Sequence, residues 1–406
     1  MKIPLAAALL ASCLILPRAE AAGVEVRISL LQSGKIDLAY QLPPGCQALP
    51  LRDGPWTLKQ QRAWRGEWQA MDDCGALGDH GLTRSNAACS SMRFSVPVRA
   101  EAPDRQERQS APAYAIGQQG VYLHTASFAP DTSCGPVTWR FAAPNGTVVV
   151  DGQARGTEFA MPETSAISLR TTAVYFSRLP IDNSAEAITV FAPEVPGWLR
   201  SGLREASAGI VQHYRQTFSH IAFPLPMLAV SNARDDQGPR LQADVSHGRM
   251  MRFAFANAGD DLDVKRLQAA RGTLAHEYAH VLQSGMRSEA YLHPERTVLA
   301  EGGAEFLRWI SEYRLGWKNG AVLGEELDEA LNLCLMQIGD QPWQRALKRN
   351  AGRTPYQCGL AIHVLTLAAR SSPYKAETVL GNFYAAVKRN PKADIGLAID
   401  CDNVPG

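Results

Sequence analysis

Residues Leu274–Leu282 read LAHEYAHVL, which places the pattern HExxH inside a run of helix-forming residues. In a helix, residues four apart lie one turn apart on the same face, so the imidazoles of His276 and His280 can reach a single ion. Glu277 is offset around the helix, which directs its carboxylate at a water on that ion rather than at the ion itself. The pattern therefore predicts a zinc site on a helix, with Glu277 as general base.

The next segment downstream, Thr297–Phe306, reads TVLAEGGAEF and predicts a second helix. A catalytic zinc needs a third protein ligand and an open position for water, and Glu301 is the predicted third ligand. The Gly302-Gly303 pair removes side-chain bulk, so we expect this helix to pack closely against the HExxH helix. Glu305 lies one turn after Glu301, where it can accept the second N–H of a ligating histidine. A solvent-facing Glu305 is the alternative.

The order HExxH, then Glu-Gly-x-Ala on the following helix, resembles the gluzincin zinc peptidases of the aminopeptidase N and glycyl aminopeptidase type. The similarity covers roughly 187–370, and the gap between His280 and Glu301 is two residues longer than the family's usual gap. The resemblance implies a thermolysin-like, mostly helical catalytic domain that binds one Zn²⁺. It also implies hydrolysis of a peptide or protein substrate by a metal-activated water, with Glu277 taking the proton.

The segment Thr354–Gly359 is similar to the family segment that carries a catalytic tyrosine, although Cys358 replaces the family's lysine. The resemblance implies that Tyr356 donates a hydrogen bond to the oxyanion of the reaction. A packing residue at the start of a helix is the alternative.

One family motif is missing. At the position where aminopeptidase N relatives hold the substrate amine with a Gly-x-Met-Glu-Asn segment, Ser246–Arg252 reads SHGRMMR and has no acidic residue. Strict aminopeptidase specificity is therefore not expected, and exopeptidase and endopeptidase activity stay open. Arg249 or Arg252 could receive a substrate carboxylate, or could form the basic face of an edge strand. A catalytically inactive relative that binds peptides or proteins is the second functional hypothesis, and the intact Glu277 counts against it.

The chain before the helices reads as β-rich, with alternating apolar residues from Val24 to Leu30 and again between 137 and 176. The segment Asp72–Arg108 reads as a polar, irregular loop. We expect an α+β protein: an N-terminal β-sandwich-like domain over 22–192, then the catalytic domain over 193–406. Apolar residues at helical spacing predict one helix around 203–218, and further helices at about 263–284, 296–315, 321–338, 342–349, 356–370 and 376–389.

The N-terminus has the layout of a secretory signal peptide: Lys2, an apolar run over Ile3–Leu16, and small residues ending at Ala21. Residues 1–21 are therefore predicted to be removed, and the protein to be exported, periplasmic or secreted. A lipoprotein anchored at Cys13 is the alternative. No other stretch is apolar over the length that a transmembrane helix needs. The net charge of +1 gives no sign of a nucleic-acid partner.

Removal of the signal peptide leaves seven cysteines. Export makes disulfides chemically possible. The pairs Cys74/Cys89 and Cys334/Cys358 are the first candidates, and an odd count leaves at least one thiol outside them.

Overall fold

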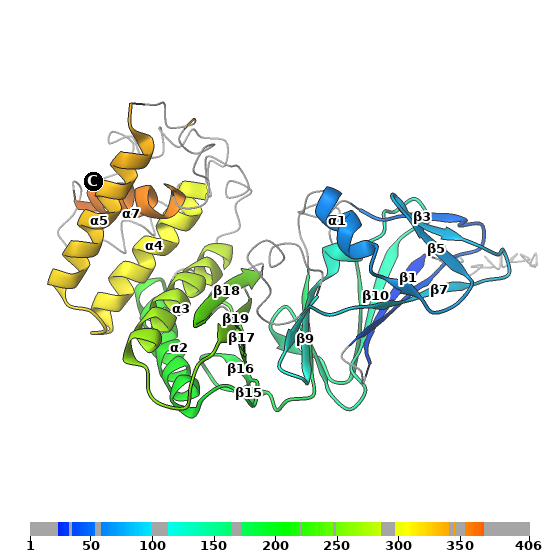
Figure 1. Cartoon of the computed structure of the whole chain (residues 1–406), viewed down its shortest axis with the longest axis horizontal. Coiled ribbons are helices and arrows are strands. Elements are labelled where there is room, and N and C mark those ends of the chain that lie inside the picture. The colour runs from blue at the N-terminus through cyan, green and yellow to red at the C-terminus, as the bar shows by residue number, and fades with distance from the viewer. Residues whose placement is uncertain are drawn as a thin grey trace, which may run out of the picture.

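The computed structural model describes residues 23–31, 35–52, 58–99, 113–163, 172–219, 221, 223–234, 236, 238–246, 249–285, 297–340, 345 and 354–368 of the chain. The expected signal peptide at 1–21, Cys13, Cys401 and the helix expected at 376–389 lie outside these residues, as does all but residue 345 of the helix expected at 342–349. Figure 1 shows a β-rich half on the right, a sheet covered by helices in the centre, and further helices on the left. The fold is a mixed α/β arrangement of several sheets and helices.

The first sheet, called the outer sheet here, has six strands. In spatial order they are β13 (Glu158–Pro162), β10 (Val137–Ala142), β1 (Val24–Leu30), β2 (Ile36–Gln41), β7 (Ser91–Val96) and β4 (Gln69–Ala70). β1 pairs with β10 in parallel, and the other neighbours are antiparallel. Beside it lie a three-stranded sheet, a short helix and a 3₁₀ turn: β3 (Ala48–Pro50), β6 (Gly81–Arg84), β5 (Gly75–Gly78), α1 (Leu58–Arg65) and η1 (Thr125–Ser127).

The second sheet, called the middle sheet, is antiparallel throughout. Its strands in spatial order are β12 (Gln153–Ala154), β11 (Thr147–Val150), β14 (Ala173–Ser177), β9 (Gly120–His124) and β8 (Ala113–Ile116). All five residues of β14 are buried, which is unusual for an antiparallel strand and requires cover on both faces.

The third sheet, called the supporting sheet, carries the helices. Its strands in spatial order are β15 (Asp182–Asn183), β16 (Ile188–Phe191), β17 (Met227–Ala233), β19 (Met250–Ala256) and β18 (Arg240–Ser246). β16, β17 and β19 run parallel, and the two edge strands are antiparallel to their neighbours. Because this sheet begins at β15, it starts upstream of residue 192, and the division of the chain into domains at that residue stays a prediction.

The outer, middle and supporting sheets are stacked as layers, because side chains that alternate along a strand enter the cores on its two faces. In β14, Val174 and Phe176 enter the core shared with the outer sheet, whereas Tyr175 between them enters the core shared with the supporting sheet. In β19, Met250 faces the middle sheet, while Met251 enters the core beneath the helices. The middle and supporting sheets are therefore each buried on both faces, which explains their long apolar runs.

The described helices that follow β16 in the chain pack on the free face of the supporting sheet and on one another. They are α2 (Gly197–Thr217), α3 (Val264–Gly285), α4 (Thr297–Arg314), α5 (Gly320–Ile338) and α7 (Thr354–Ala368). Apolar side chains from α2, α3 and α4 share one core with β17 and β19. None of the described helices combines the length and the apolar character that crossing a membrane requires.

The expectation of an irregular loop over Asp72–Arg108 is wrong for the residues that the structure describes. This segment contains β5, β6 and β7, and β7 is an interior strand between β2 and β4. Met92, Phe94 and Val96 alternate with polar residues and fill the core below the outer sheet. The alternation spans only six residues, and its polar surroundings concealed it.

The described part of the chain contains three disulfides, Cys46–Cys134, Cys74–Cys89 and Cys334–Cys358. The latter two are the pairs expected from the sequence, and Cys46–Cys134 was not anticipated because its partners are 88 residues apart. Three disulfides fit a protein that folds in an oxidising environment.

Candidate metal centre

The HExxH segment lies in the middle of α3, and its two histidines point the same way. The Nε2 atoms of His276 and His280 are 3.1 Å apart, and the ring planes are nearly perpendicular. The apolar residues between and beside them, including Ala275 and Ala279, face the core between the helices and the supporting sheet. Burial of that face fixes the rotation of α3 and presents both imidazoles to α4.

Glu301 of α4 completes a triangle of ligand atoms. Its Oε2 lies 3.3 Å from the Nε2 atom of His276 and 3.3 Å from that of His280. These three residues form the His–His–Glu cluster that could hold a metal ion in the described part of the chain.

The spacing of these atoms fits a tetrahedral zinc ion. Ligand atoms about 2.0–2.1 Å from a tetrahedral zinc lie about 3.3 Å from one another. The observed separations of 3.1, 3.3 and 3.3 Å match that value. Two imidazoles and one carboxylate are also a donor set that catalytic zinc sites use, with the fourth position left for water.

The opposite ring nitrogen of each histidine has its own acceptor. His276 Nδ1 lies 2.9 Å from Glu305 Oε1, and His280 Nδ1 lies 2.9 Å from Gln283 Oε1. Gln283 Nε2 donates to the carbonyl of Ala300, so the amide oxygen is the atom that faces His280. With Nδ1–H directed at these acceptors, each neutral ring keeps its Nε2 lone pair available for a metal ion held between the two rings and Glu301.

Glu305 thus contacts His276 from the position that its sequence spacing indicated. Gln283 was missed, although it is three residues after His280 and therefore on the same helix face. A buried glutamine at that spacing is the signal that could have found it, because Gln283 is 5% exposed.

Electrostatics favour a positive charge at the centre of the cluster. Burial raises the pKa of the Glu301 carboxyl, but its hydrogen bonds with His276 and His280 outweigh burial and bring the pKa well below its usual range. Burial lowers the pKa of His276, yet its hydrogen bonds with Glu301 and Glu305 raise it to about 10. Without a metal, the cluster therefore binds a proton where a cation fits, so metal binding and proton release are linked.

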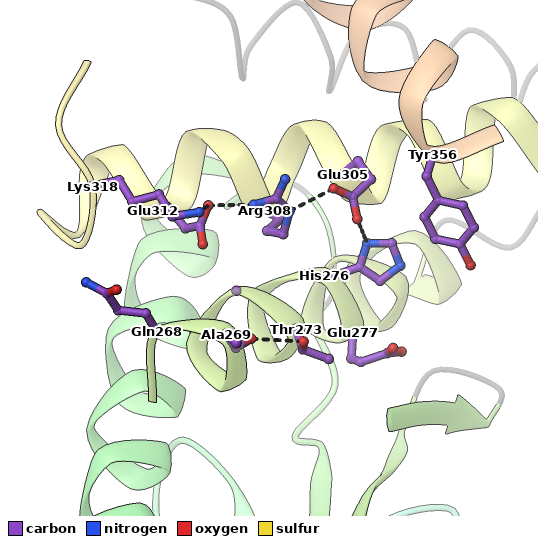
Figure 2. Close-up of a pocket in the computed structure, with 11 residues that line it drawn as sticks. Gln268, Ala269, Thr273, His276, Glu277, Glu305, Arg308, Glu312, Lys318 and Tyr356 are labelled. Atoms are coloured by element: carbon purple, nitrogen blue, oxygen red, sulfur yellow. Dashed lines mark hydrogen bonds and ion pairs between the residues drawn. The ribbon is translucent and has the colours of Figure 1, made fainter. Parts of the chain in front are cut away.

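Glu277 and Tyr356 lie beside His276. Both line a pocket of about 590 Å³ together with His276, and the Tyr356 ring stacks on the His276 ring with centroids 5.6 Å apart. Figure 2 shows Glu277 below His276 and Tyr356 to the right of it. Burial and the neighbouring Glu301 raise the pKa of Tyr356, which keeps its hydroxyl protonated and able to donate.

Tyr356 reaches the site because α7 packs tightly on α4. A Cβ atom on Gly302 would lie 2.3 Å from the Cα atom of Gly359, so the two helix backbones touch there. The expectation that the glycine pair brings α4 against the HExxH helix is therefore wrong for Gly302, whose close contact is with α7. The disulfide Cys334–Cys358 fixes the same part of α7 to α5.

Neither arginine proposed as a substrate contact lines the pocket beside Glu277. Arg252 is 1% exposed, and its guanidinium lies 4.0 Å from the centroid of the Tyr114 ring in the middle sheet. Strand alternation explains this position, because Met251 and Phe253 face the helices while Arg252 faces the opposite way. Arg249 precedes β19 and lies near Asp151. Burial raises the pKa of the Asp151 carboxyl, and the charge of Arg249 partly offsets that rise. A role for these arginines in substrate binding finds no support in the described structure.

Comparison with known proteins yields similarity in fold. No protein-family model and no curated protein sequence matches the chain. Its structure is similar to that of an aminopeptidase N family protein from Idiomarina loihiensis, with a TM-score of 0.63 and 12% identity. That match covers 91% of this chain and 71% of the other.

Weaker similarities are found to two further proteins. Native leukotriene A4 hydrolase from Saccharomyces cerevisiae has a TM-score of 0.46 at 11% identity, over 95% of this chain and 69% of the other. An M1 zinc metallopeptidase from Deinococcus radiodurans has a TM-score of 0.40 at 11% identity, over 92% and 88%. The chain thus has a fold like that of an aminopeptidase N family protein, and a His–His–Glu cluster at the junction of two of its helices.

Proposed function

We propose that this protein is a zinc-dependent peptidase in which His276, His280 and Glu301 hold one Zn²⁺. The observation that carries the proposal is the triangle of ligand atoms, whose edges of 3.1–3.3 Å suit a tetrahedral zinc. The similarity in fold to an aminopeptidase N family protein supports the same class of activity.

The roles of the other residues follow from their positions. When bound, zinc polarises the scissile carbonyl and makes water a better nucleophile near neutral pH. Glu277, 8% exposed beside the pocket, accepts a proton from the attacking water and delivers it to the leaving amine. Tyr356 donates a hydrogen bond to the oxyanion that develops on the carbonyl oxygen, and removal of one such donor typically lowers kcat by about a hundredfold or more.

Zinc content and peptide hydrolysis test this function together. The purified protein is expected to bind one zinc ion and to cleave peptides, with activity lost on chelation and restored by zinc. The Glu277→Gln variant should keep its zinc and lose activity, whereas His280→Ala should lose most of the metal. A Glu277→Gln variant with full activity would refute the general-base role, and His280→Ala with a normal metal content would refute the ligand assignment.

The substrate is proposed to be a peptide or protein, without a strict requirement for a free N-terminus. A panel of peptide pairs, each with a free and an acetylated amino group, measures this requirement directly. Similar kcat/KM values within each pair are expected, and hydrolysis of the free-amine members alone would contradict the proposal.

We also propose that the protein is exported after cleavage of residues 1–21, and the three disulfides support this. N-terminal sequencing of the mature protein is expected to begin near Ala22. A blocked, lipid-modified terminus at Cys13 would instead identify a lipoprotein.

A further inference from the structure

We propose that Arg308 is a positioning residue of the metal centre: its guanidinium fixes the Glu305 carboxylate, which in turn holds the imidazole of His276. This inference rests on the zinc site proposed above and extends it to a residue that does not itself hold the ion.

Arg308 lies directly behind Glu305. Its Nε atom is 2.7 Å from Glu305 Oε2, and the other oxygen of that carboxylate, Oε1, is 2.9 Å from His276 Nδ1. Glu305 is therefore held at both oxygens, by the guanidinium on one side and by the imidazole on the other. Figure 2 shows Glu305 and Arg308 next to each other on α4, with His276 below Glu305 on α3.

The guanidinium is itself fixed from its far side. Its Nη1 atom lies 2.7 Å from Glu312 Oε2 and 3.4 Å from Glu326 Oε2, so Arg308 joins α4 to α5. Lys318 completes the group, with Nζ 2.9 Å from the same Glu312 oxygen and a second contact to Glu326. Two cations and three carboxylates thus form one connected cluster, which we call the Arg308 cluster.

The Arg308 cluster borders the pocket beside Glu277, and its central side chains are buried enough to keep one geometry. The side chain of Glu312 is 2% exposed and that of Arg308 is 17% exposed. On α3, a Cβ atom at Gly272 would lie 2.7 Å from Glu312 Oε1, so the absence of a side chain there lets α3 come close to the cluster. The same helix carries His276 one turn further on.

The chemistry of arginine suits this task better than that of lysine. The guanidinium is a rigid plane whose N–H groups point in fixed directions, and here different N–H groups meet carboxylates on opposite sides. A lysine ammonium would supply the charge without fixing the direction of Glu305. An unsupported glutamate has several rotamers, and ordering it when the metal binds would weaken metal affinity.

Lys318 provides a matched control within the same cluster. It contacts Glu312 and Glu326 and makes no described contact with Glu305, so it contributes charge and stability to the cluster but does not orient the carboxylate behind His276. If Arg308 acts only by stabilising the fold, loss of either cation should have the same effect on the metal site.

The test compares zinc affinity, measured by competition with a chromophoric chelator, in the full chain and in the variants Arg308→Met, Arg308→Lys and Lys318→Met. Apo-protein stability is measured alongside. Loss of such an outer partner typically weakens metal binding by about 10–100-fold. We expect that loss in Arg308→Met, a partial recovery in Arg308→Lys, and wild-type affinity in Lys318→Met despite its lower stability.

Zinc affinity in Arg308→Met equal to that of the wild type would overturn the inference, and so would equal losses in Arg308→Met and Lys318→Met. If Arg308→Met does not fold, Arg308→Lys decides, because wild-type zinc affinity in that variant would also overturn it. A wild-type protein that binds no zinc would refute the zinc site itself, which is a separate outcome.

Discussion

Gln283 is the residue whose contacts define the state of His280. Its amide oxygen faces His280 Nδ1, and its amide nitrogen donates to Ala300 in α4, so one side chain sets the tautomer and ties the two ligand-bearing helices together. We expect Gln283→Leu, a change of similar size, to weaken zinc affinity by about 10–100-fold. Chelator competition measures the effect. The matched control is Gln268→Leu, on the exposed face of the same helix, and equal affinities in the two variants would contradict this role.

The site residues differ in how well the sequence alone predicts their positions. The spacing of His276, Glu277 and His280 suffices to place three groups on one helix, because helical periodicity is local. Glu301 could be proposed as a ligand because it lies on the next helix, but the spacing does not give its distance from the histidines, which depends on how the two helices cross. The direction of Arg252 could not be predicted, because the layers around β19 decide which face of the strand meets which core, and both faces of the strand are apolar.

At the scale of elements, the contact between α4 and α7 determines where Tyr356 lies. The backbones meet at Gly302 and Gly359, where a Cβ atom has no room and only backbone atoms could yield. Replacement by alanine normally favours a helix by about 1 kcal/mol relative to glycine. At Gly302 we expect the opposite, a loss of about 1–3 kcal/mol from overpacking, together with reduced peptidase activity as α7 is displaced.

Denaturant unfolding measures this change, and Gly324 in α5 supplies the matched control. A Cβ atom at Gly324 meets no heavy atom within 4 Å, so Gly324→Ala should be neutral or slightly stabilising. If Gly302→Ala were as stable as Gly324→Ala, the two helices would not be in the close contact described here.

A second prediction at this scale concerns His363 in α7. The ring is buried, stacks on Phe306 and donates from Nδ1 to the carbonyl of Gly359. Burial lowers its pKa to about 4. The unfolded chain, with a histidine pKa of about 6.5, therefore binds more protons than the folded one between pH 4 and 6.5, and stability falls as the pH drops through this range.

The expected contribution is about 2 kcal/mol lost between pH 7 and pH 5, since each pKa unit corresponds to about 1.36 kcal/mol. His363→Asn keeps a donor near Gly359 and removes the titration. Urea unfolding of both proteins at pH 7 and pH 5 should show a smaller acid loss in the variant. An unchanged difference between the two pH values would show that His363 does not titrate as described.

The helices were largely predictable because their apolar residues repeat over four or more turns. Short strands were harder. β18, the antiparallel edge strand beside β19, and β5 to β7 were not anticipated, since strands of four to seven residues carry few repeats and take their identity from their neighbours. The disulfide Cys46–Cys134 was also not predictable, because its two cysteines lie in distant segments that only the fold brings together.

For the whole molecule, the layered cores link the metal centre to distant strands. The middle sheet shares one core with the outer sheet and another with the supporting sheet, which in turn shares a core with α2, α3 and α4. No described layer can lose its neighbour without exposing a large apolar face, so we expect the layers to unfold together.

Zinc provides the means to test this coupling, because a ligand that binds only the folded state stabilises whatever unfolds with its site. At a free zinc concentration of 100 times Kd the gain is about 2.7 kcal/mol. Hydrogen exchange measured by mass spectrometry can follow α3, which carries two ligands, and β10, which lies in the outer sheet far from them. If the layers form one cooperative unit, the slowest amides in both elements gain the same free energy of protection on zinc binding. Protection that rises in α3 and stays constant in β10 would show instead that the outer sheet opens independently, and that the shared middle sheet does not couple the two cores.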